Sequence, residues 1–312
     1  MKTSRTAPPA KLPLEFAFEG FRIIRHFPMV VLFWGIIGLV SYAVNALILQ
    51  ALAGNALQDV QAASQAKDGA LMMAALAKLL PAYALLIPIS IVTNSVLSCA
   101  VFRAVAGAPG KFGGLRFGMD EIRQIGVSIL FFLIVGGLYI VTAVVAGIVS
   151  GLVGFGLSAI SPALGTAAVI IVAVCVIAVF FWFVARLSLA PAQSFAEGRI
   201  TMFGSWKLTQ GNSVPLVIGY IIALVMATLV ALLCLGIFMA GLAILHNGDA
   251  MAVGRIMGSA RDFGAILGNP AVLTYVVIMN MIVAPLLMAI TFGAPASAYR
   301  LLSGRVSVES VF

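Results

Sequence analysis

Charged residues are scarce in this chain of 312 residues, of which 9% are Asp, Glu, Lys or Arg. Soluble domains carry about 25%. Ionisable side chains at membrane depth mark proton relays, ion-coupled carriers and voltage sensors. Their absence from long apolar blocks argues against a proton-coupled transporter and against an intramembrane acid–base enzyme. Six blocks lack Asp, Glu, Lys, Arg and His altogether: Phe27–Leu52, Leu79–Phe102, Ile125–Leu152, Pro162–Ala185, Val214–Leu245 and Ala271–Ala298.

Metal ligands and paired cysteines are equally scarce. Cys99, Cys175 and Cys234 lie in apolar runs without paired spacing, which predicts packing thiols rather than a disulfide or a zinc site. His26 and His246 fall at opposite membrane faces in the topology derived below, so they cannot share a metal ion. We therefore expect neither a metal nor a cofactor.

Catalytic motifs are also missing. The segment Gly107–Lys111, GAPGK, resembles a phosphate-binding loop, but Val105 stands where the first glycine is needed and no Ser or Thr follows the lysine. The chain contains no Gly-x-Ser-x-Gly nucleophile motif. These absences predict a protein that is not an enzyme.

The chain instead has long apolar runs, and 62% of its residues are hydrophobic. At about 1.5 Å per residue, each block can cross a hydrocarbon core of about 30 Å. The blocks do not alternate, so they favour helices over barrel strands. We predict an all-α polytopic membrane protein with six transmembrane helices. Residues 14–303 form one membrane domain, and residues 1–13 and 304–312 form tails, the first of them mobile.

The first apolar run is too long for a signal-peptide core and has no small-residue cleavage site after it. We expect it to remain as a membrane anchor.

Basic residues fall mainly on one side of this topology. With six spans both termini share a side, and the opposite side holds only four of the 18 Lys and Arg: Lys67, Lys78, Arg255 and Arg261. The positive-inside rule therefore predicts that both termini are cytoplasmic. Because the net charge of +8 lies on that face, we expect anionic lipid headgroups as partners and no nucleic acid.

A short motif recurs before each odd-numbered span. FEGFR at Phe18–Arg22, FGGLR at Phe112–Arg116 and FGSWK at Phe203–Lys207 share the pattern Phe-x-(Gly/Ser)-(large apolar)-(Lys/Arg). Each even-numbered span ends at an arginine: Arg103, Arg186 and Arg300. The agreement in topological position predicts three pseudo-repeated two-helix hairpins, covering residues 18–106, 112–189 and 203–303.

The recurring motif has the composition of an amphipathic foot on the inner leaflet. Phe203 and Trp206 share a helical face, tryptophan prefers the headgroup boundary, and Lys207 can reach phosphate. One interpretation is generic anchoring of the chain at the membrane surface. The specific interpretation is the capture of acidic headgroups by Arg22, Arg103, Arg116, Arg186, Arg300, Trp206 and Lys207.

Asparagines are among the deepest polar groups of the spans. Asn94 follows Pro88 by six residues, and Asn280 precedes Pro285 by five. A proline frees a carbonyl one turn back, and a nearby amide can compensate. The two asparagines are therefore interpreted either as kink and packing devices or as a polar patch in a central cavity.

Asp120 and Glu121 form the only adjacent acidic pair in the sequence. With Arg116 and Arg123 nearby, they favour a solvated ion-pair cluster on the inner face. A catalytic dyad that acts on lipid headgroups is the alternative.

A ridge of small residues, Ala143, Gly147 and Gly151, lies on the third span. Such ridges let helices approach closely, which predicts packing inside the chain or, alternatively, a homo-oligomer interface.

Two external segments are long. Gly54–Lys78 is expected to extend the second span as a helix. Apolar residues that include Val253 and Ile256 predict that His246–Gly268 contains a helix lying on the outer leaflet, either simply docked at the interface or, alternatively, capping a cavity.

Two loop segments carry a resemblance to a known family. FGSWKLTQGN at 203–212, between the fourth and fifth of six spans, resembles the glycerophosphoryl diester phosphodiesterase membrane-domain family and related uncharacterised six-span bacterial proteins. LRFGMDEIRQ at 115–124 is similar to stretches of inner-membrane proteins of alphaproteobacteria. The resemblance implies a multi-pass protein of the bacterial cytoplasmic (inner) membrane. In that family a soluble phosphodiesterase can accompany the membrane part, and we do not expect hydrolase activity here.

The sequence thus predicts a non-enzymatic membrane protein that interacts with anionic lipid or another amphiphile, in transport, envelope maintenance or scaffolding. One alternative is an uncoupled channel or facilitator lined by Asn94 and Asn280. A second is a membrane enzyme acting on lipid headgroups at Asp120 and Glu121.

Overall fold

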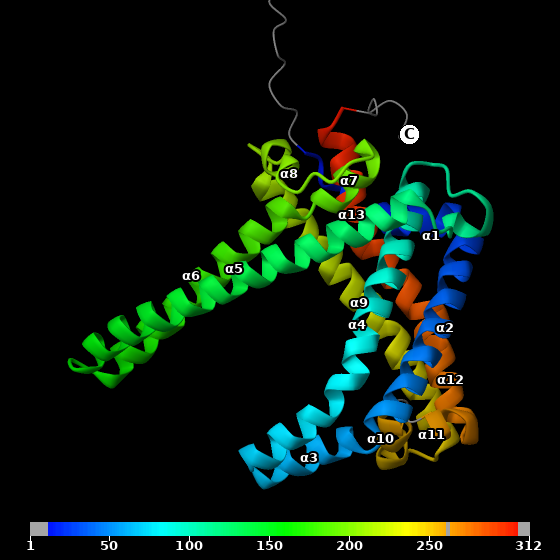
Figure 1. Ribbon diagram of the computed structural model, residues 1–312, viewed down its shortest axis with the longest axis horizontal. Helices are drawn as coiled ribbons and strands as arrows, with labels where there is room; N and C mark the ends of the chain where they lie inside the picture. Colours follow the sequence, from blue (N-terminus) through cyan, green and yellow to red (C-terminus); the bar gives the residue numbers. More distant parts are fainter. Residues whose placement is uncertain (1–11, 260–262, 305–312) are drawn as a thin grey trace, which may run out of the picture. The chain divides into compact units, whose positions relative to one another are not determined.

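A computed structural model describes residues 12–259 and 263–304 of the chain (Figure 1). Nearly all of the predicted tails, 1–13 and 304–312, therefore lie outside the described residues. The described part is built of helices, with no strand in it. The helices are α1 (Glu19–His26), α2 (Pro28–Ala53), α3 (Ala56–Ala66), α4 (Gly69–Val105), α5 (Met119–Ser158), α6 (Pro162–Leu187), α7 (Ala190–Glu197), α8 (Gly204–Leu208), α9 (Ser213–Leu245), α10 (Ala250–Gly258), α11 (Phe263–Gly268), α12 (Pro270–Ile278) and α13 (Ala284–Leu302).

Three short segments have other helical geometries. Leu14–Phe18 and Lys111–Gly114 are 3-10 turns, called η1 and η2. Met279–Val283, called η4, is a π-helix that joins α12 to α13.

Six helical segments are long and apolar enough to cross a membrane, which confirms the predicted all-helical, multi-pass class. They are Pro28–Ala53, Gly69–Val105, Lys111–Ser158, Pro162–Glu197, Ser213–Leu245 and Pro270–Leu302. The three-hairpin repeat and the cytoplasmic location of the termini stay predictions.

Prolines and short polar residues set where several of these helices begin. A proline occupies the first turn of α2, α6 and α12, where its missing N–H has no intrahelical partner to lose. The Asn269 side chain accepts a hydrogen bond from the N–H of Ala271, and the Asp68 carboxylate caps α4 in the same way. These four spans therefore have starts defined by local sequence.

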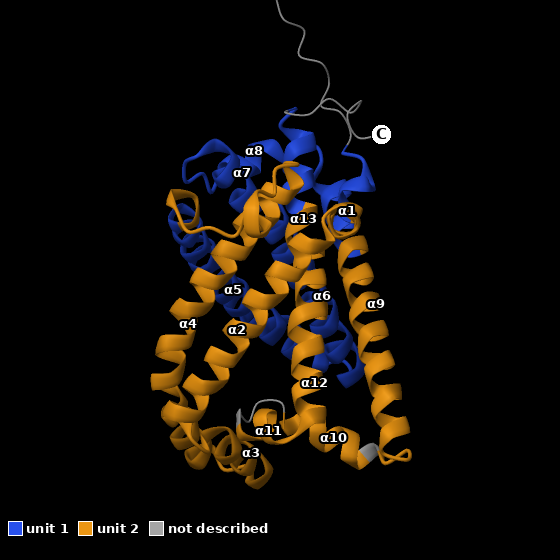
Figure 2. Ribbon diagram, turned by 90° about the vertical axis from the view of Figure 1, so that its right-hand side faces the viewer, with its two compact units in different colours: residues 1–17, 122–221, 295–312 blue, residues 18–121, 222–294 orange. Residues whose placement is uncertain are grey.

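The chain divides into two compact units, shown in different colours in Figure 2. Unit 1 comprises residues 1–17, 122–221 and 295–312, and unit 2 comprises residues 18–121 and 222–294. Each unit is described below by itself.

In unit 2, helix α2 packs closely against the π-helix. A side chain at Gly35 would collide with the backbone carbonyl of Met281, and one at Gly38 would lie 3.1 Å from the Asn280 carbonyl oxygen. Pro285 follows at once and has no N–H to give to Met281, which removes the α-helical hydrogen bond at this point. The N–H of Ala284 instead donates to the Met279 carbonyl, five residues back, as in a π-helix.

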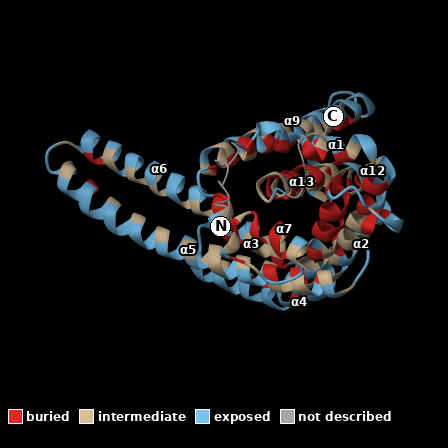
Figure 3. Cartoon of the chain, turned by 90° about the horizontal axis from the view of Figure 1, so that it is seen from above, coloured by how far each residue is buried: buried red, intermediate tan, exposed pale blue. Residues whose placement is uncertain are grey.

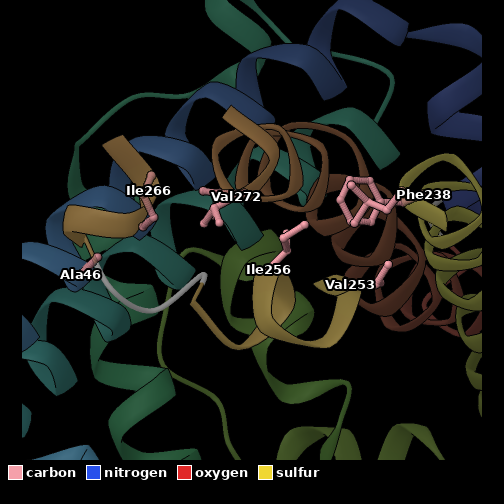
Figure 4. Close-up of a cluster of buried hydrophobic side chains, with 8 residues drawn as sticks. Ala46, Phe238, Val253, Ile256, Ile266 and Val272 are labelled. Atoms are coloured by element: carbon pink, nitrogen blue, oxygen red, sulfur yellow. The ribbon is translucent and has the colours of Figure 1, made fainter. Parts of the chain in front are cut away.

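The segment that follows α9 contains the predicted helix, as α10 and α11, but its apolar residues pack into unit 2. Val253 and Ile256 of α10 and Ile266 of α11 are buried against Phe238 and Val272 in a hydrophobic cluster (Figure 4). The apolar stripe read from the sequence is real, but its partner is the protein core rather than lipid.

Helix α3 packs against the end of α2 and the start of α4. Ala53, Ala56, Leu79 and Ala82 form a second buried cluster. The predicted extension of the second span is present, because α4 begins at Gly69, but α3 is a separate helix that ends at a left-handed Lys67.

In unit 1, α5 and α6 form a two-helix hairpin that is exposed along most of its length, as the colours of Figure 3 show. The two helices meet near their connection, where a side chain at Gly154 would press on Val169. A side chain at Gly147 or Gly151 would meet nothing within 4 Å. Among the described residues of unit 1, nothing therefore packs on the ridge at Gly147 and Gly151.

Candidate functional site

Arg103, at the end of α4, is a buried guanidinium that holds the loop after it. It donates to the Gly114 carbonyl at 2.6 Å and to Asp120 at 3.3 Å, and it pairs closely with Glu121. The Glu121 side chain is fully buried and also accepts from the Gly118 N–H. The cluster therefore ties the loop to the start of α5.

The same loop is held from α2. Trp34, 1% exposed, donates its indole N–H to the Gly113 carbonyl at 2.9 Å. Two neighbouring carbonyls of the FGGLR motif thus accept hydrogen bonds from side chains of two different helices, α2 and α4. The residues that carry them are adjacent glycines with positive φ, a conformation that glycine adopts readily.

Arg186, at the end of α6, holds the FGSWK segment in a comparable way. It donates to the Trp206 carbonyl at 2.6 Å and to the Thr209 hydroxyl at 3.2 Å. Its guanidinium also lies 3.9 Å from the Trp206 ring centroid and 5.3 Å from that of Trp182. The tryptophan predicted at the headgroup boundary is thus stacked on an arginine of its own chain.

The seven side chains predicted to hold headgroups divide into three groups by exposure. Arg103 and Arg186 are buried, and each guanidinium already has partners inside the chain, so a headgroup is not needed to satisfy either charge. Arg22 and Arg116 are 42% and 64% exposed, although each pairs with a carboxylate, and Lys207 is exposed. Arg300 and Trp206 are half-buried. The exposed side chains are the ones open to lipid.

The acidic pair is an ion-pair cluster in which Asp120 bridges Arg103 and Arg116. It is less solvated than predicted, because Glu121 has no exposed surface.

The two asparagines of the predicted polar patch have different surroundings. Asn94 is exposed, and its amide donates to the Ser90 carbonyl of its own helix at 2.9 Å. Asn280 is half-buried in the π-helix, donates to the Val276 carbonyl at 2.9 Å and lines a cleft, whereas Asn94 is not among that cleft's lining residues.

This cleft, which we call the amide cleft, has a volume of about 1150 Å³ and lies within unit 2. Five carboxamide side chains and two tyrosines contribute to it, together with Ser259 and apolar residues that include Leu49 and Met279. The carboxamides are Gln50, Asn55, Gln58, Gln61 and Asn280, and the tyrosines are Tyr42 and Tyr275. Its volume slightly exceeds the usual range of ligand pockets, about 300–1,000 Å³.

The amide cleft runs from the end of the spans toward their middle. Asn55, Gln58 and Gln61 lie on α3 and the turn before it, beyond the end of α2. Asn280 lies ten residues past the start of the final span at Pro270, or about 15 Å along a helix, which is half of a hydrocarbon core. The cleft therefore extends along the final span for about half of the length that a hydrocarbon core would need.

Charged groups near the amide cleft are paired with one another. The Lys78 ammonium lies 2.7 Å from the Asp59 carboxylate, and Arg255 lies 3.8 Å from Asp249. None of the described residues that line the cleft is Asp, Glu, Lys, Arg or His. The lining offers neutral hydrogen-bond donors and acceptors rather than a fixed charge.

Sequence reasoning found Asn280 and missed the other four carboxamides. A signal was present, because Asn55–Gln65 carries four amides with a single charge, Asp59. Gln58 and Gln61 are three apart and so share a helical face.

The described residues contain no group of three or more His, Cys, Asp or Glu that could hold a metal ion. The cysteines differ from the predicted packing thiols, because only Cys99 is buried, while Cys234 is half-buried and Cys175 is exposed.

Comparisons of the chain with protein-family models, with curated proteins and with solved structures find no match. The resemblance to the glycerophosphoryl diester phosphodiesterase membrane-domain family therefore stays a prediction.

Proposed function

We propose that the protein is a non-enzymatic membrane protein that binds a lipid or related amphiphile, with the polar part of the ligand in the amide cleft. The observation that carries this proposal is the cleft itself, about 1150 Å³ and lined by carboxamides at one end and by Tyr42, Tyr275 and Met279 farther along. Ligand sites combine an apolar wall with a few polar groups that fix orientation. An amphiphile has both kinds of surface.

The absence of fixed charge in the described lining favours an uncoupled binder over an ion-coupled carrier. Coupling to protons or sodium relies on ionisable or ion-coordinating groups at membrane depth. Asn280, the deepest lining amide, uses its N–H to satisfy the Val276 carbonyl. It is therefore suited to orienting a ligand.

Anionic lipid remains part of the proposal at a different surface. We propose that both termini face the cytoplasm of a bacterial inner membrane and that Arg22, Arg116 and Lys207 attract acidic headgroups there. Their exposure supports this assignment. Arg103 and Arg186 are better explained as clamps on the FGGLR and FGSWK segments.

The two clamps also support the proposed three-hairpin repeat. In each case an arginine that ends an even-numbered span donates to a backbone carbonyl of the next recurring motif, at Gly114 or at Trp206.

A facilitator of small neutral solutes is the second candidate, because Asn280 lines the amide cleft as that hypothesis requires. An enzyme at Asp120 and Glu121 has less support, because both carboxylates are held by Arg103. A homo-oligomer through Ala143, Gly147 and Gly151 is consistent with the open space beside the two glycines.

Photocrosslinking in native membranes tests the lead proposal. Leu57, in the amide cleft, is replaced by the photoreactive residue benzoylphenylalanine, and Leu229, an exposed residue of α9, is replaced in a matched control. We expect one or a few lipid adducts at position 57 and a mixture that follows bulk lipid at position 229. The same bulk mixture at both positions would rule out a lipid site in the cleft, and solute flux into proteoliposomes would then favour the facilitator.

A further inference from the structure

The lining of the amide cleft indicates which kind of lipid headgroup it would accept. The inference that follows rests on the proposed function. We infer that the ligand's polar part is uncharged and rich in hydroxyl groups, as in a glycosyl or polyol lipid, rather than a phosphate or an ammonium group. Three features of the cleft carry the inference: the chemistry of its amides, an acceptor oxygen without a partner beside it, and the pairing of the charges around it.

Carboxamides match hydroxyl groups in hydrogen-bonding capacity. Each Asn or Gln offers an N–H₂ donor and a carbonyl acceptor, and each hydroxyl both donates and accepts. Gln50, Asn55, Gln58 and Gln61 bring four such groups to one end of the cleft. A phosphate could accept hydrogen bonds from the amide N–H groups. It has no proton to donate to the amide carbonyl oxygens.

Asn45 adds an acceptor that is already out of water. Its Oδ1 is buried and has no hydrogen-bond partner in the structure. Asn45 lies three residues after Tyr42 and four before Leu49, both of which line the cleft, so it belongs to the same face of α2. Asn45 is not itself a lining residue, but a buried acceptor without a partner is destabilising, and a ligand donor that reached it from the cleft would remove this cost.

The described residues that line the cleft carry no charge that would stabilise an ionic headgroup. Burying an unpaired charge is far more costly than burying a hydroxyl that finds a hydrogen bond. The two charged pairs nearest to the lining in sequence, Asp59 with Lys78 and Asp249 with Arg255, already neutralise each other. A neutral headgroup meets no such penalty.

The apolar part of the lining completes the match. Leu49, Leu57, Val276 and the two methionines Met257 and Met279 line the same cleft as the amides. Methionine adapts its shape to irregular apolar surfaces. One ligand with a sugar-like head and an acyl chain would therefore satisfy both sides of the cleft.

Native mass spectrometry of the full chain tests the inference with defined lipids. The protein is reconstituted into phosphatidylcholine nanodiscs that contain monoglucosyl diacylglycerol, diacylglycerol or phosphatidylglycerol, and the lipid retained on release is counted. The cleft variants are Gln58→Leu/Gln61→Leu, in the lining, and Asn45→Leu, on the α2 face beside it, and Asn94→Leu on α4 is the control at an exposed amide away from the cleft. We expect preferential retention of the glucosyl lipid, reduced roughly tenfold in the cleft variants, because one or two lost hydrogen bonds of about 1 kcal/mol approach that factor.

Each other outcome overturns the inference in a recognisable way. If phosphatidylglycerol is retained in preference and the cleft variants abolish its binding, the cleft binds lipid but the headgroup class is wrong. An Arg261→Ala variant would then test a basic residue two positions after Ser259 in the sequence, outside the described residues. If no retained lipid responds to the cleft variants, the inference and the proposed function both fail. If diacylglycerol binds as tightly as its glucosyl form, the sugar does not contribute to binding. The cleft would then be a lipid site, but the inferred headgroup class would be wrong.

Discussion

Arg103 and Arg186 show how a charge is accommodated at the end of an apolar helix. An arginine has five N–H donors in a fixed plane, so one side chain can bind a carbonyl and a carboxylate together or stack on an indole while it donates. Arg103 follows the first route with Gly114 and Glu121, and Arg186 follows the second with Trp206. Each arginine holds one loop segment in place, FGGLR for Arg103 and FGSWK for Arg186, through a backbone carbonyl.

Replacement of Arg103 should destabilise the protein strongly. Arg103→Ala leaves Glu121 buried without its counter-charge, which typically costs about 3–5 kcal/mol. Arg116→Ala, which removes an exposed partner of the same cluster, should cost less than about 1 kcal/mol. Thermal unfolding in detergent compares the two variants.

The double variant Arg103→Leu/Glu121→Leu should recover part of the lost stability, because it leaves no unpaired charge. Equal unfolding temperatures for Arg103→Ala and Arg116→Ala would contradict the clamp.

The sequence placed these arginines correctly at helix ends but could not show what they bind. The spacing from Arg103 to Glu121 is eighteen residues and passes through a loop with positive-φ glycines, whose path no periodic pattern specifies. Asn94 and Asn280 look alike in sequence, each near a proline, yet only Asn280 lines the amide cleft. The difference arises from tertiary packing.

At the scale of elements, the π-helix at Met279–Val283 is the feature with most influence on the amide cleft. It turns the Asn280 amide toward the Val276 carbonyl and brings the backbone of Met281 against Gly35. Single-turn π segments occur frequently at functional sites. The sequence signal was Pro285, which predicted a kink but not its form.

Gly35→Ala should therefore destabilise unit 2. The added methyl group would collide with the Met281 carbonyl, and overpacking of this kind costs about 1–3 kcal/mol. Gly136→Ala in α5 is the matched control, because a side chain there meets nothing within 4 Å. That change should be neutral or stabilising by up to about 1 kcal/mol. An equal loss of stability in the two variants would contradict the close approach of Gly35 to the Met281 carbonyl.

Helix α10 should loosen at acid pH through its cap. The N–H groups of Ala252 and Met251 donate to the Asp249 carboxylate, and with Arg255 and His246 nearby they hold its pKa below the ordinary value of 3.8. A pKa that is lower in the folded state gives stability that is present above the unfolded value and is lost as pH falls through the folded one.

A spin label at Gly254→Cys, in a background without the native cysteines, reports this transition. Its mobility should rise as the pH falls below about 3.8, and the Asp249→Asn variant should remove the response because an amide does not titrate. A response that survives in the asparagine variant would assign the transition to another group.

For the whole molecule, the long apolar blocks were sufficient to predict six membrane-spanning helices, because backbone hydrogen bonding in lipid leaves few alternatives. They could not predict that α10 and α11 pack into unit 2. An amphipathic stripe identifies a buried face without saying whether lipid or protein covers it.

Reporter fusions test the proposed orientation. Fusions at positions 115 and 200 should report the cytoplasm, and fusions at 58 and 255 should report the opposite side, following the bias of lysine and arginine. A periplasmic signal at 115 or 200 would reverse the orientation and place the mouth of the amide cleft on the cytoplasmic side.

The π-helix has one further consequence, which concerns rotation about the helix axis. The π-turn absorbs one extra residue within a single wider turn, whereas an α-helix turns once in 3.6 residues. The α12 face that carries Tyr275 and the α13 face that packs Ile290 against Gly20 therefore differ by one residue in sequence register, although they belong to one continuous span. Deletion of a single residue between 279 and 283 would remove the extra residue and leave the two faces at nearly the same angle to each other.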